Sequence, residues 1–194
     1  MPFSNITVLV LSGGKSSRMS GQDKGLMNFN GKPMIQHTLA ILSEQFSPIL
    51  ISANQNIDQY QAFGYPVIED INKDKGPLSG IEAAIKQTKT DYLLITPCDT
   101  PLVNSDVFQL LIIAAENSAK SIFVAHDGHQ LQMLHALLDL RTGELEQSIT
   151  EYLKTDRKVQ LWYEQNDYIA VDCSSASHAF KNINTPEALK EINN

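Results

Sequence analysis

The sequence predicts an α/β fold in which helices cover both faces of a mostly parallel sheet with an antiparallel edge. Short apolar, β-branched runs alternate along the chain with amphipathic stretches, and this alternation is typical of buried parallel strands joined by helices. The turn at 126–129 (HDGH) predicts a hairpin late in the chain, which would add antiparallel pairing. The 194 residues show no repeat and no linker, so we expect a single domain over 1–194.

The first half of the chain is expected to supply four strands and three helices. The run at 6–11 is short and apolar and ends at polar and glycine residues, so it predicts a buried strand. Similar runs predict strands at 48–52, 66–68 and 91–96. Helices are expected between the strands, at 33–46, 56–63 and 77–87. Pro33 and Pro77 support two of these helices, because proline suits the first helical turn.

The second half is expected to continue this alternation. Asn104 or Ser105 would cap a helix with an apolar face made of Val107, Leu110, Leu111 and Ala114. Further strands are expected at 121–125, 131–137 and 159–163. Further helices are expected at 144–153 and after Pro186.

The charge balance and the cysteine content exclude several classes of protein. The chain has 15 Lys and Arg residues against 22 Asp and Glu residues, a formal net charge of -7. Binding to duplex DNA needs basic residues to replace phosphate counterions, so we expect no nucleic acid partner. No segment reaches the roughly 20 apolar residues of a membrane span, and none resembles a signal peptide. Cys98 and Cys173 suggest no disulfide framework, so we expect a cytoplasmic protein without membrane contact.

The most informative segment is the glycine- and serine-rich stretch at 11–26, directly after the first expected strand, where open α/β sheets bind ligands. Gly13 and Gly14 let backbone N–H groups approach phosphate oxygens closely. Arg18 and Lys24 add positive charge that suits phosphates gaining charge during transfer. The spacing excludes a P-loop, which needs glycine where Leu9 stands, and it excludes a dinucleotide fingerprint. A surface loop of the same composition without function is the alternative.

Carboxylates follow two of the later strands. Asp99 stands in the segment 97–101 (PCDTP), at the carboxyl end of a strand expected in the sheet centre. An oxygen ligand there suits Mg²⁺, which takes one or two carboxylates together with substrate phosphates. Asp70 follows a short strand, and the segment 76–80 (GPLSG) forms a turn at a helix N-terminus, where an anion could bind. The alternative for both carboxylates is ordinary turn capping.

Taken together, six segments resemble the molybdenum cofactor guanylyltransferases, within the wider group of phospho-sugar-type nucleotidyltransferases. The matching segments are 11–19 (LSGGKSSRM), 23–26 (DKGL), 30–33 (NGKP), 76–80 (GPLSG), 97–101 (PCDTP) and 182–186 (NINTP). They follow the order of that family and span nearly the whole chain. The forms at 23–25, 97–101 and 182–186 separate this family from the wider group.

The resemblance implies a Rossmann-like three-layer sandwich and an enzyme that depends on Mg²⁺. It implies GTP as the nucleotide donor and molybdopterin carrying molybdenum as the acceptor. The product would be the guanine dinucleotide form of the molybdenum cofactor, with pyrophosphate released. Other molybdenum cofactor biosynthesis proteins and the acceptor molybdoenzymes are the partners that it implies.

The resemblance also assigns roles to residues. The positions that match the GTP site are Leu11, Ser12, Gly13, Gly14, Lys24, Ser52, Asp70 and Asp99. Lys24 matches the phosphate-binding lysine and Asp99 the magnesium ligand, and together with Arg18 they are the candidate catalytic residues. Asn182 and Asn184 match a segment associated with the pterin substrate.

Several positions depart from the pattern of the family. Ser12 replaces a more usual alanine, and Ser20 stands where glycine is common. Ser52 and Asn54 lie where the family often has an asparagine that touches the nucleotide. The segment 130–137 lacks the proline that the family's hairpin usually carries. This last departure concerns the acceptor site more than the donor site.

Two other functions remain open on the sequence. One is a related transferase that uses CTP or acts on a sugar phosphate; the other is a non-catalytic nucleotide-binding chaperone for the cofactor. The histidines His126, His129 and His135 match no common metal-ligand spacing, and we expect a solvated turn at the first two. Cys98 is expected to be a buried small residue and not a nucleophile.

Overall fold

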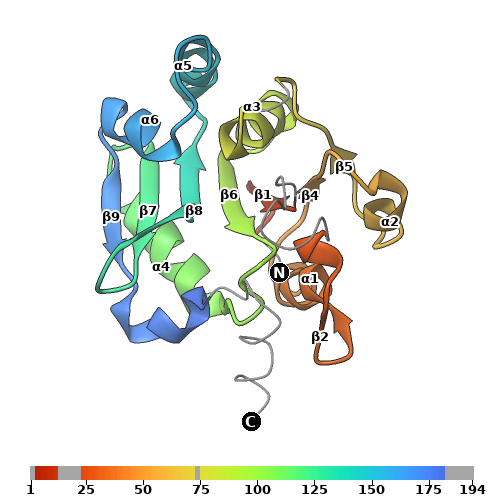
Figure 1. Cartoon of the computed structure of the whole chain (residues 1–194). Helices are drawn as coiled ribbons and strands as arrows, with labels where there is room; N and C mark the ends of the chain where they lie inside the picture. The colour runs from red at the N-terminus through yellow and green to blue at the C-terminus, as the bar shows by residue number, and fades with distance from the viewer. Residues whose placement is uncertain (1–2, 13–22, 73–74, 182–194) are drawn as a thin grey trace.

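The computed structural model describes residues 3–12, 23–72 and 75–181, which are arranged around one seven-stranded sheet (Figure 1). The strands of this sheet are β1 (Ile6–Leu11), β4 (Ile49–Ser52), β5 (Val67–Ile68), β6 (Tyr92–Pro97), β7 (Ile122–His126), β8 (Leu131–Asp139) and β9 (Ile169–Asp172). A separate two-stranded hairpin consists of β2 (Asn28–Phe29) and β3 (Lys32–Pro33).

The strands lie in the order β5-β4-β1-β6-β8-β7-β9. The first four of these are parallel to one another, and β9 is parallel to β7. Among the described strands of this sheet, only β8 runs the other way, and it pairs antiparallel with β6 and with β7. The predicted fold class is therefore confirmed, but the antiparallel strand β8 lies inside the sheet, between β6 and β7, and not at its edge.

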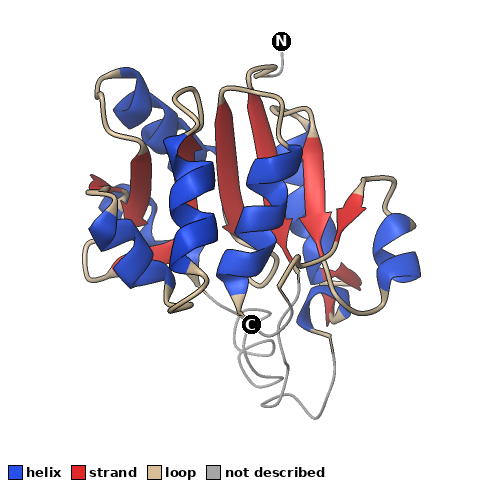
Figure 2. Cartoon of the chain, turned by 90° about the horizontal axis from the view of Figure 1, so that it is seen from above, coloured by secondary structure: helices blue, strands red, loops and turns tan. Residues whose placement is uncertain are grey.

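Helices form a layer on each face of the sheet (Figures 1 and 2). One layer holds α1 (Met34–Ser43) and α4 (Ser105–Glu116). The other holds α3 (Pro77–Gln87), α5 (Glu144–Tyr152) and α6 (Val159–Gln165). A short helix, α2 (Ile57–Gln61), lies next to β5, and the 3-10 helices are η1 (Lys24–Leu26) and η2 (Ser174–Phe180).

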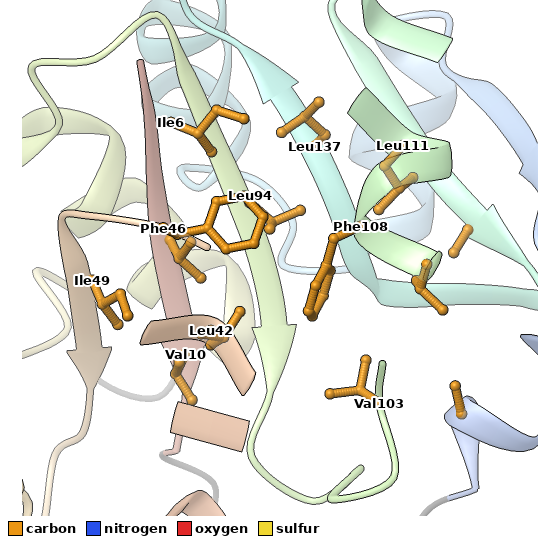
Figure 3. Close-up of a cluster of buried hydrophobic side chains, with 14 of the residues drawn as sticks. Ile6, Val10, Leu42, Phe46, Ile49, Leu94, Val103, Phe108, Leu111 and Leu137 are labelled. Carbon is orange, nitrogen blue, oxygen red and sulfur yellow. The ribbon is translucent and has the colours of Figure 1, made fainter. Parts of the chain in front are cut away.

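The sheet separates two hydrophobic cores because successive side chains of a strand point to opposite faces. In β1, Val8 and Val10 belong to the core beneath α1 and α4, whereas Leu9 and Leu11 belong to the core beneath α3. Figure 3 shows the first of these cores, where the rings of Phe46 and Phe108 meet edge to face with centroids 5.8 Å apart. Burying one such side chain contributes about 1.5–3 kcal/mol.

The helix starts follow the expected signals. Asn104 caps α4, and its side chain accepts a hydrogen bond from the Val107 N–H at 3.4 Å. Val107 and Leu111 are fully buried on this helix, together with Phe108. Pro77 opens α3, as predicted, and the helix ends at Gln87. None of the helices in the described part of the chain has the length and apolar character that a membrane span requires.

One predicted element is wrong. The run at 159–163 forms the helix α6 and not a strand. Its aromatic and β-branched residues favour a strand locally, but Val159, Trp162 and Tyr163 have helical spacing, and the two aromatic residues are fully buried. The last strand of the sheet is instead β9, which the sequence does not predict. The helix expected after Pro186 lies outside the described residues.

Candidate active site

Four neighbouring parallel strands end along one edge of the sheet, and candidate residues stand at these ends. Leu11, the last residue of β1, is paired with Ser52 at the end of β4 and with Pro97 at the end of β6. β5 ends two residues before Asp70, and β6 ends two residues before Asp99. Because the four strands are adjacent (Figure 1), these described candidate residues share one edge of the sheet.

Lys24 and Asp99 lie side by side, although 75 positions separate them in the sequence. The Nζ atom of Lys24 is 3.5 Å from Oδ2 of Asp99, and the two side chains are 31% and 21% exposed. A partly exposed pair of this kind contributes only about 1 kcal/mol or less to stability. Its arrangement instead places a cation and a carboxylate together within reach of solvent.

Asp23 holds the residues around Lys24 in place. Its Oδ1 accepts the N–H of Gly25 at 3.2 Å, which caps η1, and the hydroxyl of Tyr60 at 2.6 Å. Its Oδ2 accepts the side-chain amide of Asn56 at 3.0 Å. A carboxylate with partners on both oxygens has little freedom to turn. The chain therefore enters η1, and Lys24, from a fixed point.

Cys98 is a structural residue, as expected. Its backbone N–H donates to the carbonyl oxygen of Leu11 at 3.0 Å, which ties the Asp99 turn to the end of β1. The side chain is only 4% exposed. Burial, with a smaller contribution from the charge of Asp99, raises the pKa of the Cys98 thiol to about 12. A thiol that stays protonated at neutral pH is a poor nucleophile.

A second group of candidate residues lies around the first turns of α3. A Cβ atom on Gly80 would lie 2.5 Å from Ser52 Oγ and 3.3 Å from Asp70 Oδ1, so glycine allows the helix to approach the strand ends. The backbone N–H of Asp70 donates to the side-chain oxygen of Asn54 at 2.9 Å. Burial raises the pKa of the Asp70 carboxyl, and a side-chain hydrogen bond between this carboxyl and Asn54 partly offsets this. Ser52 and Asp70 are thus close to the same point on α3.

A buried histidine supports the turn that carries Asp99. The ring Nε2 of His135, on β8, lies 3.1 Å from the hydroxyl of Thr100, the residue after Asp99. The other side of the ring packs edge to face on Phe180, with centroids 5.1 Å apart. Burial lowers the pKa of His135 to about 3, so the ring is neutral at physiological pH. His135 therefore acts as a packing and hydrogen-bonding residue.

Several predicted site residues cannot be placed. Gly13, Gly14 and Arg18, in the glycine-rich segment, lie outside the described residues, and so do Asn182 and Asn184 near the C-terminus. The roles assigned to these five residues stay predictions. The structure brings together Lys24 and Asp99, and separately Leu11, Ser52 and Asp70 around Gly80.

The chain matches one known protein family over most of its length. Residues 8–168 match the MobA-like NTP transferase domain. This match covers most of the chain, from the first strand to just before β9. The chain belongs to the MobA-like NTP transferase family.

Individual relatives agree with this assignment, and the chain is a nucleotidyltransferase. It is 40% identical over 194 residues to a molybdenum cofactor guanylyltransferase of Shewanella putrefaciens, covering 99% of this chain and 97% of the relative. It is also 40% identical over 189 residues to the enzyme of the same name from Shewanella frigidimarina, covering 96% and 95%. The fold is similar to that of molybdopterin-guanine dinucleotide biosynthesis protein A from Archaeoglobus fulgidus, with a TM-score of 0.78, 22% identity and 95% coverage of both chains.

The described residues around Asp99 fit Mg²⁺ better than a metal ion that is held entirely by protein side chains. Across the described ranges, no group of three or more His, Cys, Asp or Glu side chains could hold a metal ion by itself. Asp99 instead offers one partly exposed carboxylate beside a lysine. A single carboxylate is a suitable ligand for Mg²⁺, which usually retains water and completes its shell with substrate phosphates.

The sequence does not predict the residues that hold the segments carrying Lys24 and Asp99 in place. Asp23 carries a local signal, because an aspartate just before a helical turn is a typical N-cap. Tyr60, Asn56 and His135 carry none, since each reaches its partner across more than 30 residues. These contacts exist only once the sheet has brought the segments together.

Proposed function

We propose that this nucleotidyltransferase moves GMP from Mg-GTP to the terminal phosphate of molybdopterin, forming molybdopterin guanine dinucleotide and pyrophosphate. The observation that carries the proposal is the pair Lys24 and Asp99, 3.5 Å apart at the carboxyl edge of the sheet. The names of the relatives that are 40% identical over nearly their whole length support the choice of guanine and molybdopterin.

In the proposed reaction, an oxygen of the acceptor phosphate attacks the α-phosphorus of GTP. A new P–O bond forms there as the bond to the pyrophosphate group breaks, so no protein nucleophile is required. Catalysis then depends on alignment and on stabilising negative charge. Lys24 would bind the phosphates and the leaving pyrophosphate. Asp99 would hold Mg²⁺, which when bound offsets the charge of the triphosphate.

The remaining assignments rest on the family resemblance of the sequence. Leu11, Ser12, Ser52 and Asp70 would contact the nucleotide, and Gly13, Gly14 and Arg18 would extend the same site towards the phosphates. Asn182 and Asn184 would contact the pterin. We expect the reaction to take place in the cytoplasm, alongside other molybdenum cofactor biosynthesis proteins and the molybdoenzymes that receive the product.

A comparison of nucleotide donors tests the proposal. The purified protein is incubated with Mg²⁺, molybdopterin and either GTP, CTP, ATP or UTP, and both the dinucleotide product and pyrophosphate are measured. We expect product from GTP. Product from CTP alone would assign the chain to the cytidylyl relatives instead. Tight binding of GTP without release of pyrophosphate would point to a non-catalytic carrier of the cofactor.

A further inference from the structure

The proposed reaction does not use the hydroxyl of Tyr60, although this group is buried next to the segment that carries Lys24. Tyr60 lies on α2, and its side chain is fully buried. The hydroxyl is 2.6 Å from Oδ1 of Asp23 and 3.3 Å from the backbone oxygen of Ser12. Ser12 and Asp23 flank residues 13–22 in the sequence, so one hydroxyl contacts the chain on both sides of these residues.

The bond from Tyr60 to Asp23 is of the stronger kind. A phenol has one proton to donate, and here the closer acceptor is a carboxylate oxygen, which makes the bond charge-assisted. Burial, and then the neighbouring Cys98 and Asp23, raise the pKa of Tyr60 well above its usual range. The hydroxyl therefore remains a donor at every pH at which the enzyme would work.

This bond reaches Lys24 through one further step. Asp23 directly precedes Lys24, and the oxygen that accepts the Tyr60 hydroxyl also accepts the N–H of Gly25. Without the Tyr60 hydroxyl, Asp23 would keep Gly25 and Asn56 as partners among the described residues. The carboxylate would lose the shortest of its hydrogen bonds to these residues, so the start of η1 would be held less firmly.

Close packing joins the same hydroxyl to the Asp99 side of the site. A Cβ atom built on Gly25 would lie 2.5 Å from the Tyr60 hydroxyl oxygen and 3.1 Å from Cys98 Sγ. Gly25 follows Lys24, and Cys98 precedes Asp99. The ring of Tyr60 therefore packs where the two segments that carry the cation and the carboxylate meet.

We infer that Tyr60 is a positioning residue for nucleotidyl transfer, which holds the segment carrying Lys24 in its place beside Asp99 through the hydrogen bond to Asp23. The inference rests on the proposed function, because it takes Lys24 and Asp99 to act on Mg-GTP. It goes further by assigning a kinetic effect to a buried hydroxyl that touches no substrate. A tyrosine that only fills the core would lose nothing specific to GTP when its hydroxyl is removed.

The variant Tyr60→Phe tests this because it keeps the ring and removes only the hydroxyl. We expect KM for GTP to rise about tenfold, the effect of one lost hydrogen bond to a charged group, while KM for molybdopterin changes less than about twofold. Tyr163→Phe is the matched control. Tyr163 is also fully buried, and its hydroxyl donates to the carbonyl of Met133 at 3.1 Å on the other face of the sheet. Its GTP kinetics should equal those of the wild type.

Further variants separate a positioning role of Tyr60 from a general loss of packing around it. If Tyr60 acts through Asp23, the double variant Tyr60→Phe/Asp23→Asn should raise KM for GTP no more than Asp23→Asn alone. Gly25→Ala should be less harmful in the Tyr60→Phe background, because the oxygen nearest the new methyl group is gone. The thermal midpoint of each variant is measured in parallel, so that loss of folding is recognised.

Equal GTP kinetics in Tyr60→Phe and wild type would overturn the inference, and so would an equal rise of both KM values. Direct titration of Mg-GTP into each protein distinguishes this from failure of the proposed function. A wild-type protein that binds no Mg-GTP overturns the proposed function, and the inference with it. A wild type that binds Mg-GTP while Tyr60→Phe binds it equally well overturns the inference alone.

Discussion

The imidazole of His135 lies 3.1 Å from the hydroxyl of Thr100, the neighbour of Asp99, and both side chains are almost completely buried. The turn that presents the candidate metal ligand is thus anchored on an uncharged histidine from the one antiparallel strand of the described sheet. Protonating that ring would place a charge in a buried site, which costs free energy.

The stability of the protein should therefore fall in mild acid. Burial lowers the pKa of His135 from 6.5 to about 3, so between these values the unfolded chain binds a proton that the folded chain does not. Stability is then fully present above pH 6.5 and decreases as the pH falls, by about 2 kcal/mol at pH 5 for this group. Urea unfolding of wild type and His135→Gln at pH 7, 6 and 5 measures the difference.

The variant His135→Gln keeps a polar partner for Thr100 but cannot titrate, so its stability should fall less steeply. His129→Gln, in the exposed turn between β7 and β8, is the control and should follow the wild-type profile. Parallel profiles for His135→Gln and wild type would show that His135 is not responsible for the acid sensitivity.

Replacing Lys24 should impair catalysis far more than folding. Lys24→Ala removes the cation beside Asp99. We expect kcat/KM for GTP to fall roughly 30- to 1,000-fold, which corresponds to a loss of about 2–4 kcal/mol of transition-state stabilisation. The thermal midpoint should change little, since the ion pair is partly exposed. Lys120→Ala removes a surface lysine paired with Asp167 and should leave the kinetics unchanged. Undiminished turnover of Lys24→Ala would refute the role of this lysine.

Asp99→Asn tests the proposed metal ligand. The amide keeps the shape of the side chain but lacks the negative charge that Mg²⁺ favours. We expect the Mg²⁺ concentration needed for half-maximal rate to rise at least about tenfold, with a lower maximal rate. Asp167→Asn is a suitable control because Asp167 has a left-handed backbone, at φ 55°, that asparagine also tolerates. An unchanged Mg²⁺ dependence in Asp99→Asn would place the metal elsewhere.

Gly80→Ala should disturb the strand ends next to the first turns of α3, where the second group of candidate residues lies. The new methyl group would lie 2.5 Å from Ser52 Oγ and 3.2 Å from Leu11 Cδ2, so overpacking should lower the free energy of unfolding by about 1–3 kcal/mol. Adding Ser52→Ala removes the closest atom and should recover part of this loss. Unfolding of the single and double variants in urea measures both effects; no recovery would mean that the contact with Leu11 dominates.

Local pattern was sufficient for most of the secondary structure. The strands at β1 and β6 and the helix α3 follow from apolar runs, prolines and glycines that act within a few residues. The helix α6 was missed because its aromatic residues favour a strand locally, whereas burial against the sheet selected the helical spacing of the same residues. Tertiary packing overrides a weak local preference in a segment this short.

The sequence by itself determined most of the order of the elements and pointed to two of the candidate groups, Lys24 and Asp99. Only the tertiary structure decided how close they lie, which residues hold them and which face each helix covers. Spacing along the chain carries no information about a contact such as Tyr60 to Asp23 or His135 to Thr100. Such contacts arise because the pairing of β4, β1, β6 and β8 brings distant segments to neighbouring positions, and burial then makes each hydrogen bond obligatory.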